Sequence, residues 1–173
     1  MNTEKNTSQS TTVLHHDQRI KKLQEFRLQF VNDYQEHSNE ALYSGCLKTI
    51  ESIYGETGFA AVALNRNLRH LSVIFSNMAN FSLDSLAEEI KVKVRDNDTV
   101  PRQSNDKQFV LFTITAESGW IANFIIIKFN QQVIKSDIDF IQELASLIGF
   151  KQTLRIKWSP PSRQSFIEFK MVA

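Results

Sequence analysis

The stretch Lys107–Phe129, KQFVLFTITAESGWIANFIIIKF, decides the fold that the sequence predicts. Val, Ile, Phe and Thr dominate its two apolar runs, Gln108–Thr115 and Trp120–Phe129, and these residue types suit a pleated, mostly buried strand. The connection between the runs ends in Gly119, which can adopt the positive φ of a tight turn. Apolar side chains alternate onto both faces of each run. We therefore expect a β-hairpin in the middle of a sheet, with other elements packed on both sides.

The composition is that of a soluble globular protein with one domain of ordinary size. Of its 173 residues, 42% are hydrophobic and 23% are charged, and the net charge of +1 gives no overall field that favours nucleic acid. No apolar run is long enough to span a bilayer, and the first residues, MNTEKNTSQSTT, lack the apolar segment of a signal peptide. The single cysteine, Cys46, excludes an internal disulfide and a multi-cysteine metal site. We therefore expect a cytoplasmic protein.

The N-terminal part divides into a polar tail and a helix. Residues 1–17 are rich in Asn, Ser, Thr and Gln, which predicts a disordered tail, and the adjacent His15 and His16 lack further residues at metal-ligand spacing. From residue 18 to residue 37 apolar residues recur every three or four positions on a charged background. This spacing predicts an amphipathic helix. Its apolar residues are Ile20, Leu23, Phe26, Phe30, Val31 and Tyr34.

Residues 38–158 form the expected domain, and residues 159–173 follow it as a tail. The alternating segment Ser165–Met171 in this tail is either an edge strand or a docking segment. Within the domain, capping and turn residues separate helical stripes from β-rich runs. The expected order is helix, strand, strand, helix, hairpin and helix, at 39–54, 58–64, 71–77, 82–94, 108–129 and 136–154.

This order of elements resembles a GAF domain, the ligand-sensing relative of the PAS fold, over about residues 42–154. The resemblance rests on an amphipathic helix that leads into the strand GFAAVAL (Gly58–Leu64), on the hairpin with its turn Glu117-Ser118-Gly119, and on the closing helix entered through VIKSDIDFI (133–141). A Roadblock or profilin-like domain has a related layout and stays an alternative. The resemblance implies an α+β fold, with a central antiparallel sheet, helices packed on it and the amphipathic helix in front.

Residues with enzymatic chemistry are scarce. The sequence has no P-loop, no dinucleotide-binding glycine turn, no zinc-spaced His and Glu pair and no nucleophile elbow. The GAF-like methionine sulfoxide reductases use several cysteines, whereas this chain has one. We therefore expect a protein that is not an enzyme and that uses no cofactor and no metal.

Four polar residues are candidates for ligand binding. Arg95 and Asp98 match an R-x-x-D pattern that binds a cyclic dinucleotide in some signalling domains, although the pattern itself favours a solvated charge cluster. Asn123 lies between isoleucines of a strand, so it either lines a cavity or is a hydrogen-bonded buried amide. Thr113 is expected on the same face of the sheet.

The resulting interpretation is a non-catalytic signalling or regulatory domain that binds a small ligand, such as a cyclic nucleotide, or a protein partner. The alternative is an adaptor without a ligand, and a filled interior beneath the helix at 82–94 would favour it. The N-terminal helix places Leu23, Phe26, Phe30 and Tyr34 on one side. We expect this side to form a homodimer or to hold a partner, unless the helix folds back onto its own domain.

Overall fold

The computed structural model describes residues 5–32, 39–65 and 70–158, and the side chains of 16–29, 39–65 and 70–149. These residues form an α+β fold around a five-stranded antiparallel sheet with the strand order β2-β1-β5-β4-β3, which confirms the predicted fold class. The elements in chain order are α1 (Lys5–Asn32), α2 (Asn39–Tyr54), β1 (Gly58–Asn65), β2 (His70–Ser76), α3 (Ala87–Asp96), β3 (Arg102–Gln103), β4 (Val110–Thr115), β5 (Ile121–Lys128) and α4 (Lys135–Trp158).

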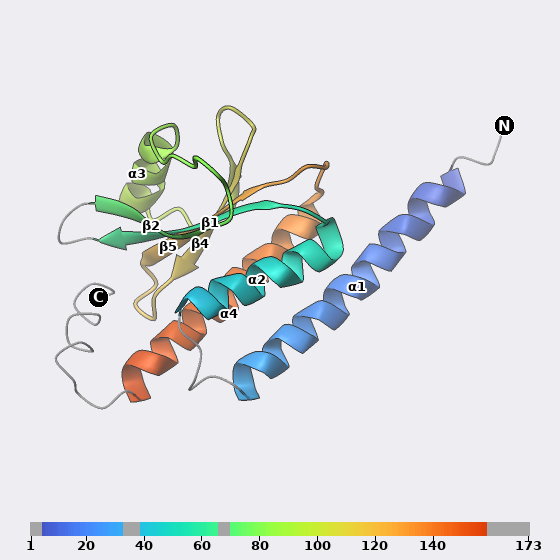
Figure 1. Cartoon of the computed structure of the whole chain (residues 1–173), viewed down its shortest axis with the longest axis horizontal. Coiled ribbons are helices and arrows are strands. Elements are labelled where there is room, and N and C mark those ends of the chain that lie inside the picture. The colour runs from blue at the N-terminus through green and yellow to red at the C-terminus, as the bar shows by residue number, and fades with distance from the viewer. Residues whose placement is uncertain (1–4, 33–38, 66–69, 159–173) are drawn as a thin grey trace.

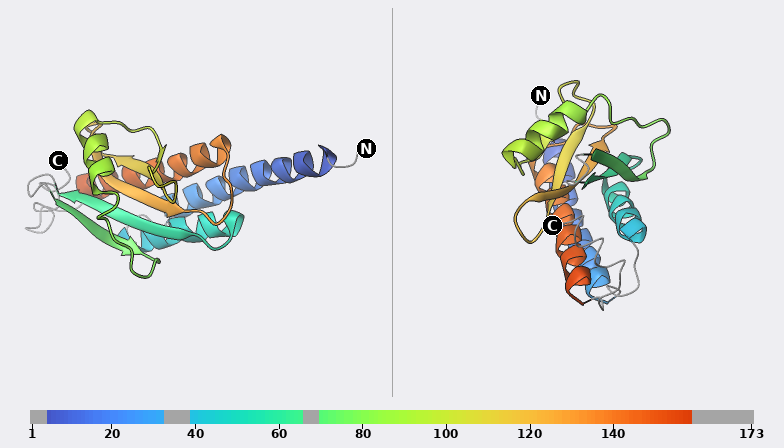
Figure 2. Two further views of the ribbon diagram at one scale, coloured as in Figure 1. Left: turned by 90° about the horizontal axis from the view of Figure 1, so that it is seen from above. Right: turned by 90° about the vertical axis from the view of Figure 1, so that its left-hand side faces the viewer.

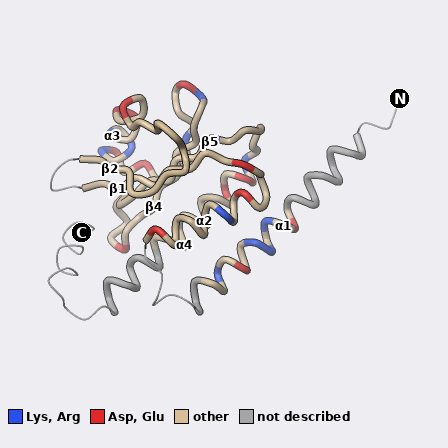
Figure 3. The backbone as a smooth tube through the Cα atoms, viewed as in Figure 1, with Lys and Arg blue, Asp and Glu red and all other residues tan. Residues whose placement is uncertain are grey.

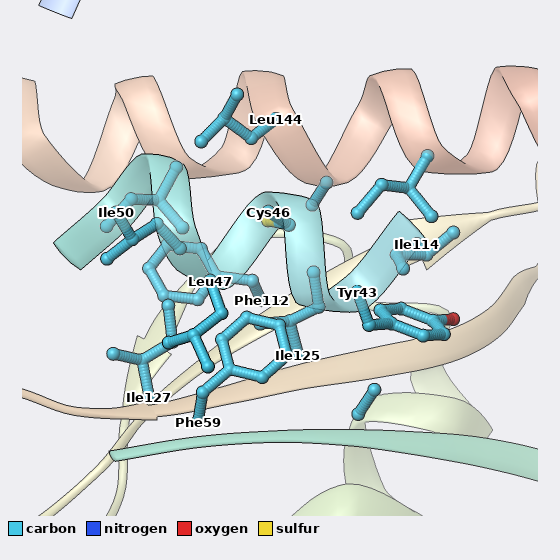
Figure 4. Close-up of a cluster of buried hydrophobic side chains, with 14 of the residues drawn as sticks. Tyr43, Cys46, Leu47, Ile50, Phe59, Phe112, Ile114, Ile125, Ile127 and Leu144 are labelled. Carbon is cyan, nitrogen blue, oxygen red and sulfur yellow. The ribbon is translucent and has the colours of Figure 1, made fainter. Parts of the chain in front are cut away.

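The helices form layers on both faces of the sheet (Figure 1). Helices α1, α2 and α4 lie on one face and α3 lies on the other. Figure 4 shows the main core, in which Phe59, Phe112 and Ile125 of the sheet meet Cys46 of α2 and Leu144 of α4. All five side chains are completely buried, so this layer supplies the domain with a continuous apolar core.

The hairpin of residues 107–129 lies at the centre of the sheet, as predicted. Strand β5 pairs with β1 on one side and with β4 on the other, and Gly119 in the connecting turn has a φ of +81°. The pairing shifts between Ile114 and Thr115, because Ile114 lies opposite Asn123 while Thr115 lies opposite Ile121. Ala122 is therefore the extra residue of a β-bulge. Because of this extra residue, Ile121 and Asn123 point to opposite faces of the sheet, although they are two positions apart in the strand.

Two helices begin at other residues than the sequence predicts. Helix α1 begins at Lys5, within the segment expected as a tail, and residues 5–32 contain neither proline nor glycine to interrupt it. Its N-terminal half extends beyond the other elements (Figure 2). Helix α3 begins at Ala87, not at Ser82, because the Ser82 hydroxyl accepts a hydrogen bond from Asp84 N in a local turn. The tail segment at 165–171 lies outside the described residues.

The strand β3 was not predicted, and an aspartate caps the start of α4. Strand β3 has only two residues, too few for an alternating pattern. Helix α4 begins at Lys135, and Asp137 in its first turn caps the residue that precedes the helix: Asp137 Oδ2 accepts a hydrogen bond of 2.9 Å from Ile134 N.

Candidate functional site

The face of the sheet beneath α3 is filled with side chains. Leu86 and Ile90 of the α3 segment pack against Leu111 of β4 and Phe124 of β5, and each of them is fully buried. Interiors of this density leave no room for a ligand without side-chain movement. This part of the fold therefore acts as a second apolar core.

Lys93 of α3 is the charged residue of this layer, with 1% of its side chain exposed. Its Nζ donates hydrogen bonds of 3.1 Å to Asp98 Oδ2 and 2.6 Å to the carbonyl oxygen of Val100. A buried ammonium group is tolerated only with such partners. Lys93 therefore fixes the loop that follows α3. No sequence pattern indicates this role, because lysine is normally exposed.

The two residues of the R-x-x-D pattern bind different partners. Arg95 is exposed, and its guanidinium donates hydrogen bonds of 2.7 and 3.1 Å to the carboxylate of Asp96. Asp98 instead accepts from Lys93 and from Val100 N. Burial opposes the charged form of Asp98, but these hydrogen bonds outweigh it and lower the pKa of Asp98 below its ordinary value. A nucleotide held by both residues stays a prediction.

Asn97 connects α3 to the central hairpin. It ends the helix in a left-handed conformation with a φ of 48°. Its side chain donates to Gly119 O at 3.1 Å and accepts from Ile121 N at 3.2 Å. An asparagine after a helix is a recognisable left-handed cap. Its contacts to the hairpin depend on the tertiary fold and could not be predicted from the sequence.

Thr113 and Asn123 lie on opposite faces of the sheet. Thr113 Oγ1 donates to Thr99 O at 3.0 Å, on the side of α3, whereas Asn123 Nδ2 donates to the Tyr43 hydroxyl of α2 at 3.0 Å. The expectation that these two residues share a face is therefore wrong. The structure does not bring them together with Arg95 and Asp98 around one cavity.

An open cleft of about 640 Å³ lies at the end of the sheet where β1 begins and β5 ends. The segment 77–82, which follows β2, forms one wall, and the loop at 106–109 before β4 forms another. The Asn77 side chain secures the first wall, because it accepts from Phe59 N and donates to Thr57 O. None of the four residues expected to bind a ligand lines this cleft. The cleft was not predictable from the sequence, because its walls are largely loop residues without a motif.

The N-terminal helix folds back onto the domain over the part whose side chains are described. Phe26 is 3% exposed and belongs to the main core, and Leu23 packs against the same core. The premise that these two residues remain exposed is therefore wrong. Phe30 and Tyr34 lie outside the described side chains. A dimer or partner bound through α1 stays a prediction.

A buried ion pair joins α1 to α4. The Arg19 guanidinium donates to Asp137 Oδ1 and, at 3.1 Å, to the Ser136 hydroxyl. The Tyr54 hydroxyl at the end of α2 donates to the same Asp137 oxygen at 2.8 Å. Burial and the hydrogen bond to Asp137 raise the pKa of Tyr54. These contacts connect three helices, and no local pattern predicts a pair 118 residues apart.

No metal-binding geometry is found in the described part of the chain. No group of three or more His, Cys, Asp or Glu side chains within it is placed to hold a metal ion. Cys46 is fully buried, and burial raises the pKa of its thiol to about 12, so this sulfur stays protonated at neutral pH. No helix among the described residues is both long and apolar enough to cross a bilayer.

Comparison with solved structures shows which fold these elements make. The GAF domain of an Acinetobacter phosphoenolpyruvate-protein phosphotransferase matches 86% of this chain and 98% of its own, with a TM-score of 0.58 and 9% identity. The GAF domain of A. aeolicus nlh2, solved in an inactive state, matches 82% and 99%, with a TM-score of 0.58 and 16% identity. The GAF domain of a sensor histidine kinase from Pseudomonas syringae pv. tomato matches 88% and 94%, with a TM-score of 0.53 and 11% identity.

These likenesses confirm the GAF-like fold that the sequence predicts. No family model and no curated protein matches the sequence itself. At such low identities the likeness concerns the fold, and it transfers no ligand and no activity to this chain.

Proposed function

We propose that this chain is a non-catalytic regulatory domain that binds a small ligand in the cleft between the 77–82 segment and the 106–109 loop. The observation that carries the proposal is the cleft itself, an open volume of about 640 Å³ with walls from both loops and from the ends of β1 and β5. Small-molecule sites typically have volumes of roughly 300–1,000 Å³. The GAF domains of similar fold come from proteins that include a sensor kinase, which supports a signalling role.

Helices α1 and α4 are suited to carry the output. Helix α1 precedes the domain core and α4 follows it, and the Arg19–Asp137 pair connects them. A ligand that moves the end of the sheet would act on these helices through the main core. The buried, protonated thiol of Cys46 is compatible with the proposed cytosolic location.

The adaptor without a ligand is the second candidate, and the filled interior beneath α3 favours it. Leu86, Ile90 and Phe124 leave that face closed, so a ligand-free domain would be stable without rearrangement. In that case the described surface would act only through protein contacts. The two candidates differ in whether the cleft has an occupant.

A cleft-filling variant separates the two candidates. Purified protein is incubated with a metabolite extract, and retained molecules are identified by native mass spectrometry and by the shift in melting temperature. The variant Ser85→Trp places a large side chain at a residue that lines the cleft. The matched control, Ser118→Trp, makes the same replacement at an exposed residue of the hairpin turn. We expect retention and stabilisation in wild type and the control but not in Ser85→Trp. Absence of any retained molecule in wild type would contradict ligand binding and favour the adaptor.

A further inference from the structure

Charges of both signs surround the cleft. Lys128, at the end of β5, supplies an ammonium group, and Glu56 and Asp106 supply carboxylates. Lys128 is the only lysine or arginine among the residues that line this cleft. Within the described part of the chain the Lys128 side chain has no hydrogen bond or ion pair, and Ser104 and Gln108 bind the Asp106 carboxylate through its Oδ1 atom. The Lys128 charge is close enough to help lower the pKa of Asp106. Both groups are therefore available to a ligand.

The Asp106 carboxylate is held in a fixed orientation. Its Oδ1 accepts hydrogen bonds from the Ser104 hydroxyl and, at 3.0 Å, from Gln108 N. These hydrogen bonds, that of Ser104 first, lower the pKa of Asp106 below its ordinary value, so the group is charged at neutral pH. A carboxylate with one oxygen bound by its own loop presents the other oxygen to a donor with little loss of conformational entropy.

The same cleft has an apolar wall. Phe81 and Phe109 pack edge to face with ring centroids 6.0 Å apart, and both line the cleft while half-buried. The Met78 side chain crosses the start of β1, where a Cβ atom on Gly58 would lie 2.8 Å from Met78 Sδ. Apolar and polar groups thus alternate around one opening, as is typical of sites that orient a small amphiphilic molecule.

We propose that this cleft binds a zwitterionic small molecule of the amino-acid class with an apolar side chain. The ligand ammonium group binds Asp106 Oδ2 with Glu56 nearby, the ligand carboxylate binds Lys128, and the side chain packs against Phe81 and Phe109. This inference rests on the proposed function, because it names the ligand class of the same cleft.

The charge balance argues against two other ligand classes. A nucleotide carries at least one phosphate, which two carboxylates repel and which the single ammonium of Lys128 does not fully compensate. A metal ion needs three or more ligands, and the described residues provide no such group here. One cation with two carboxylates instead matches a ligand that carries both charges.

Half-ligands provide the sharpest test. Calorimetry measures binding of L-phenylalanine and L-leucine to the full chain, together with 2-phenylethylamine, which lacks the carboxylate, and 3-phenylpropanoate, which lacks the ammonium group. We expect each half-ligand to bind about tenfold more weakly than L-phenylalanine, because the open cleft leaves each charged hydrogen bond at the low end of its usual strength.

Two variants test which protein group binds the carboxylate of the ligand and which binds its ammonium group. Lys128→Gln should weaken L-phenylalanine about tenfold and leave 2-phenylethylamine unchanged. Asp106→Asn, which keeps an acceptor for Ser104 and Gln108, should weaken L-phenylalanine similarly and leave 3-phenylpropanoate unchanged. The matched controls Lys48→Gln and Glu143→Gln, at exposed residues of α2 and α4 outside the cleft, should bind as wild type does.

Two results would overturn the amino-acid inference alone, and a third would overturn the proposed function as well. If neither amino acid binds at millimolar concentration but another molecule is lost in Ser85→Trp, the cleft is a ligand site of a different class. If both amino acids bind equally to wild type and to the Lys128 and Asp106 variants, they bind elsewhere. If no molecule of any class binds wild type, the proposed function fails as well.

Discussion

Single buried residues set the stability of this fold, and Phe112 is one of two fully buried phenylalanines in the central hairpin. It is fully buried between the sheet and the layer of α2 and α4. Its burial was predictable, because the apolar run around it alternates onto both faces. The burial of Lys93 was not, since its partners Asp98 and Val100 are brought together only after α3 has ended.

Replacing Phe112 with alanine should cost about 3–5 kcal/mol of the free energy of unfolding, because apolar contacts are lost and a cavity remains. Urea denaturation of Phe112→Ala measures this loss. Trp120→Ala is the control, since the Trp120 side chain in the same hairpin is 49% exposed. A loss below about 1 kcal/mol for Phe112→Ala would contradict its place in the core.

The Arg19–Asp137 pair should be strongly coupled. Both side chains are nearly buried, at 6% and 11% exposure, so Asp137→Asn leaves the guanidinium without its counter-charge and should cost about 3 kcal/mol or more. The double variant Arg19→Met with Asp137→Asn should cost clearly less than the sum of the single changes. The exposed pair Lys22 and Glu25 provides a control cycle, with an expected coupling below about 1 kcal/mol. Additive losses at Arg19 and Asp137 would contradict the buried pair.

Cys46 should make the stability fall at alkaline pH. Burial raises the pKa of its thiol from 9.0 to about 12, so the folded state favours the protonated form. The contribution is therefore complete below pH 9 and is lost as the pH rises from 9 towards 12, with a slope of at most about 1.4 kcal/mol per pH unit. Cys46→Ala should show a shallower decline in urea midpoints between pH 8 and 10. An unchanged slope would show that the thiol is not desolvated.

At the scale of elements, the sequence predicts the helices and strands that have a periodic apolar pattern. It does not predict features that depend on how two strands pair. The limits of α2 and the two long hairpin strands follow from apolar spacing, and Gly55 follows α2 with a φ of +73°. The bulge at Ala122 was not predictable, because the shift appears only when β5 pairs with β4. Figure 3 shows charges of both signs interspersed along α1, a pattern equally compatible with a free and a docked helix.

Helix α1 should stabilise the domain through one of its sides only. Phe26 is 3% exposed and Leu28, two residues further along, is 62% exposed. Phe26→Ala should therefore lose about 3–5 kcal/mol, whereas Leu28→Ala should lose less than about 0.5 kcal/mol. Equal effects would contradict the docked helix. Light scattering on the same proteins tests the predicted homodimer, and a wild-type mass of one chain would exclude it.

At the scale of the whole molecule, the sequence was sufficient for the fold but not for the site. The order of helices and strands led to the GAF-like resemblance, and the structural comparisons confirm it. The cleft has walls from segments on both sides of α3, so only the assembled sheet brings Met78 and Phe109 to Lys128. Arg95 and Asp98 were predicted to bind a ligand together because they are close in sequence, although their side chains bind different partners.

The location of ligand binding tests the central claim most directly. Amide chemical shifts of the isotope-labelled full chain are recorded by two-dimensional NMR as L-phenylalanine is added. We predict saturable shifts that concentrate at residues 78–82, at 106–109 and around Lys128. Shifts concentrated at 95–102, the segment that contains Arg95 and Asp98, or a spectrum unchanged at millimolar ligand, would contradict the assignment of this cleft as the ligand site.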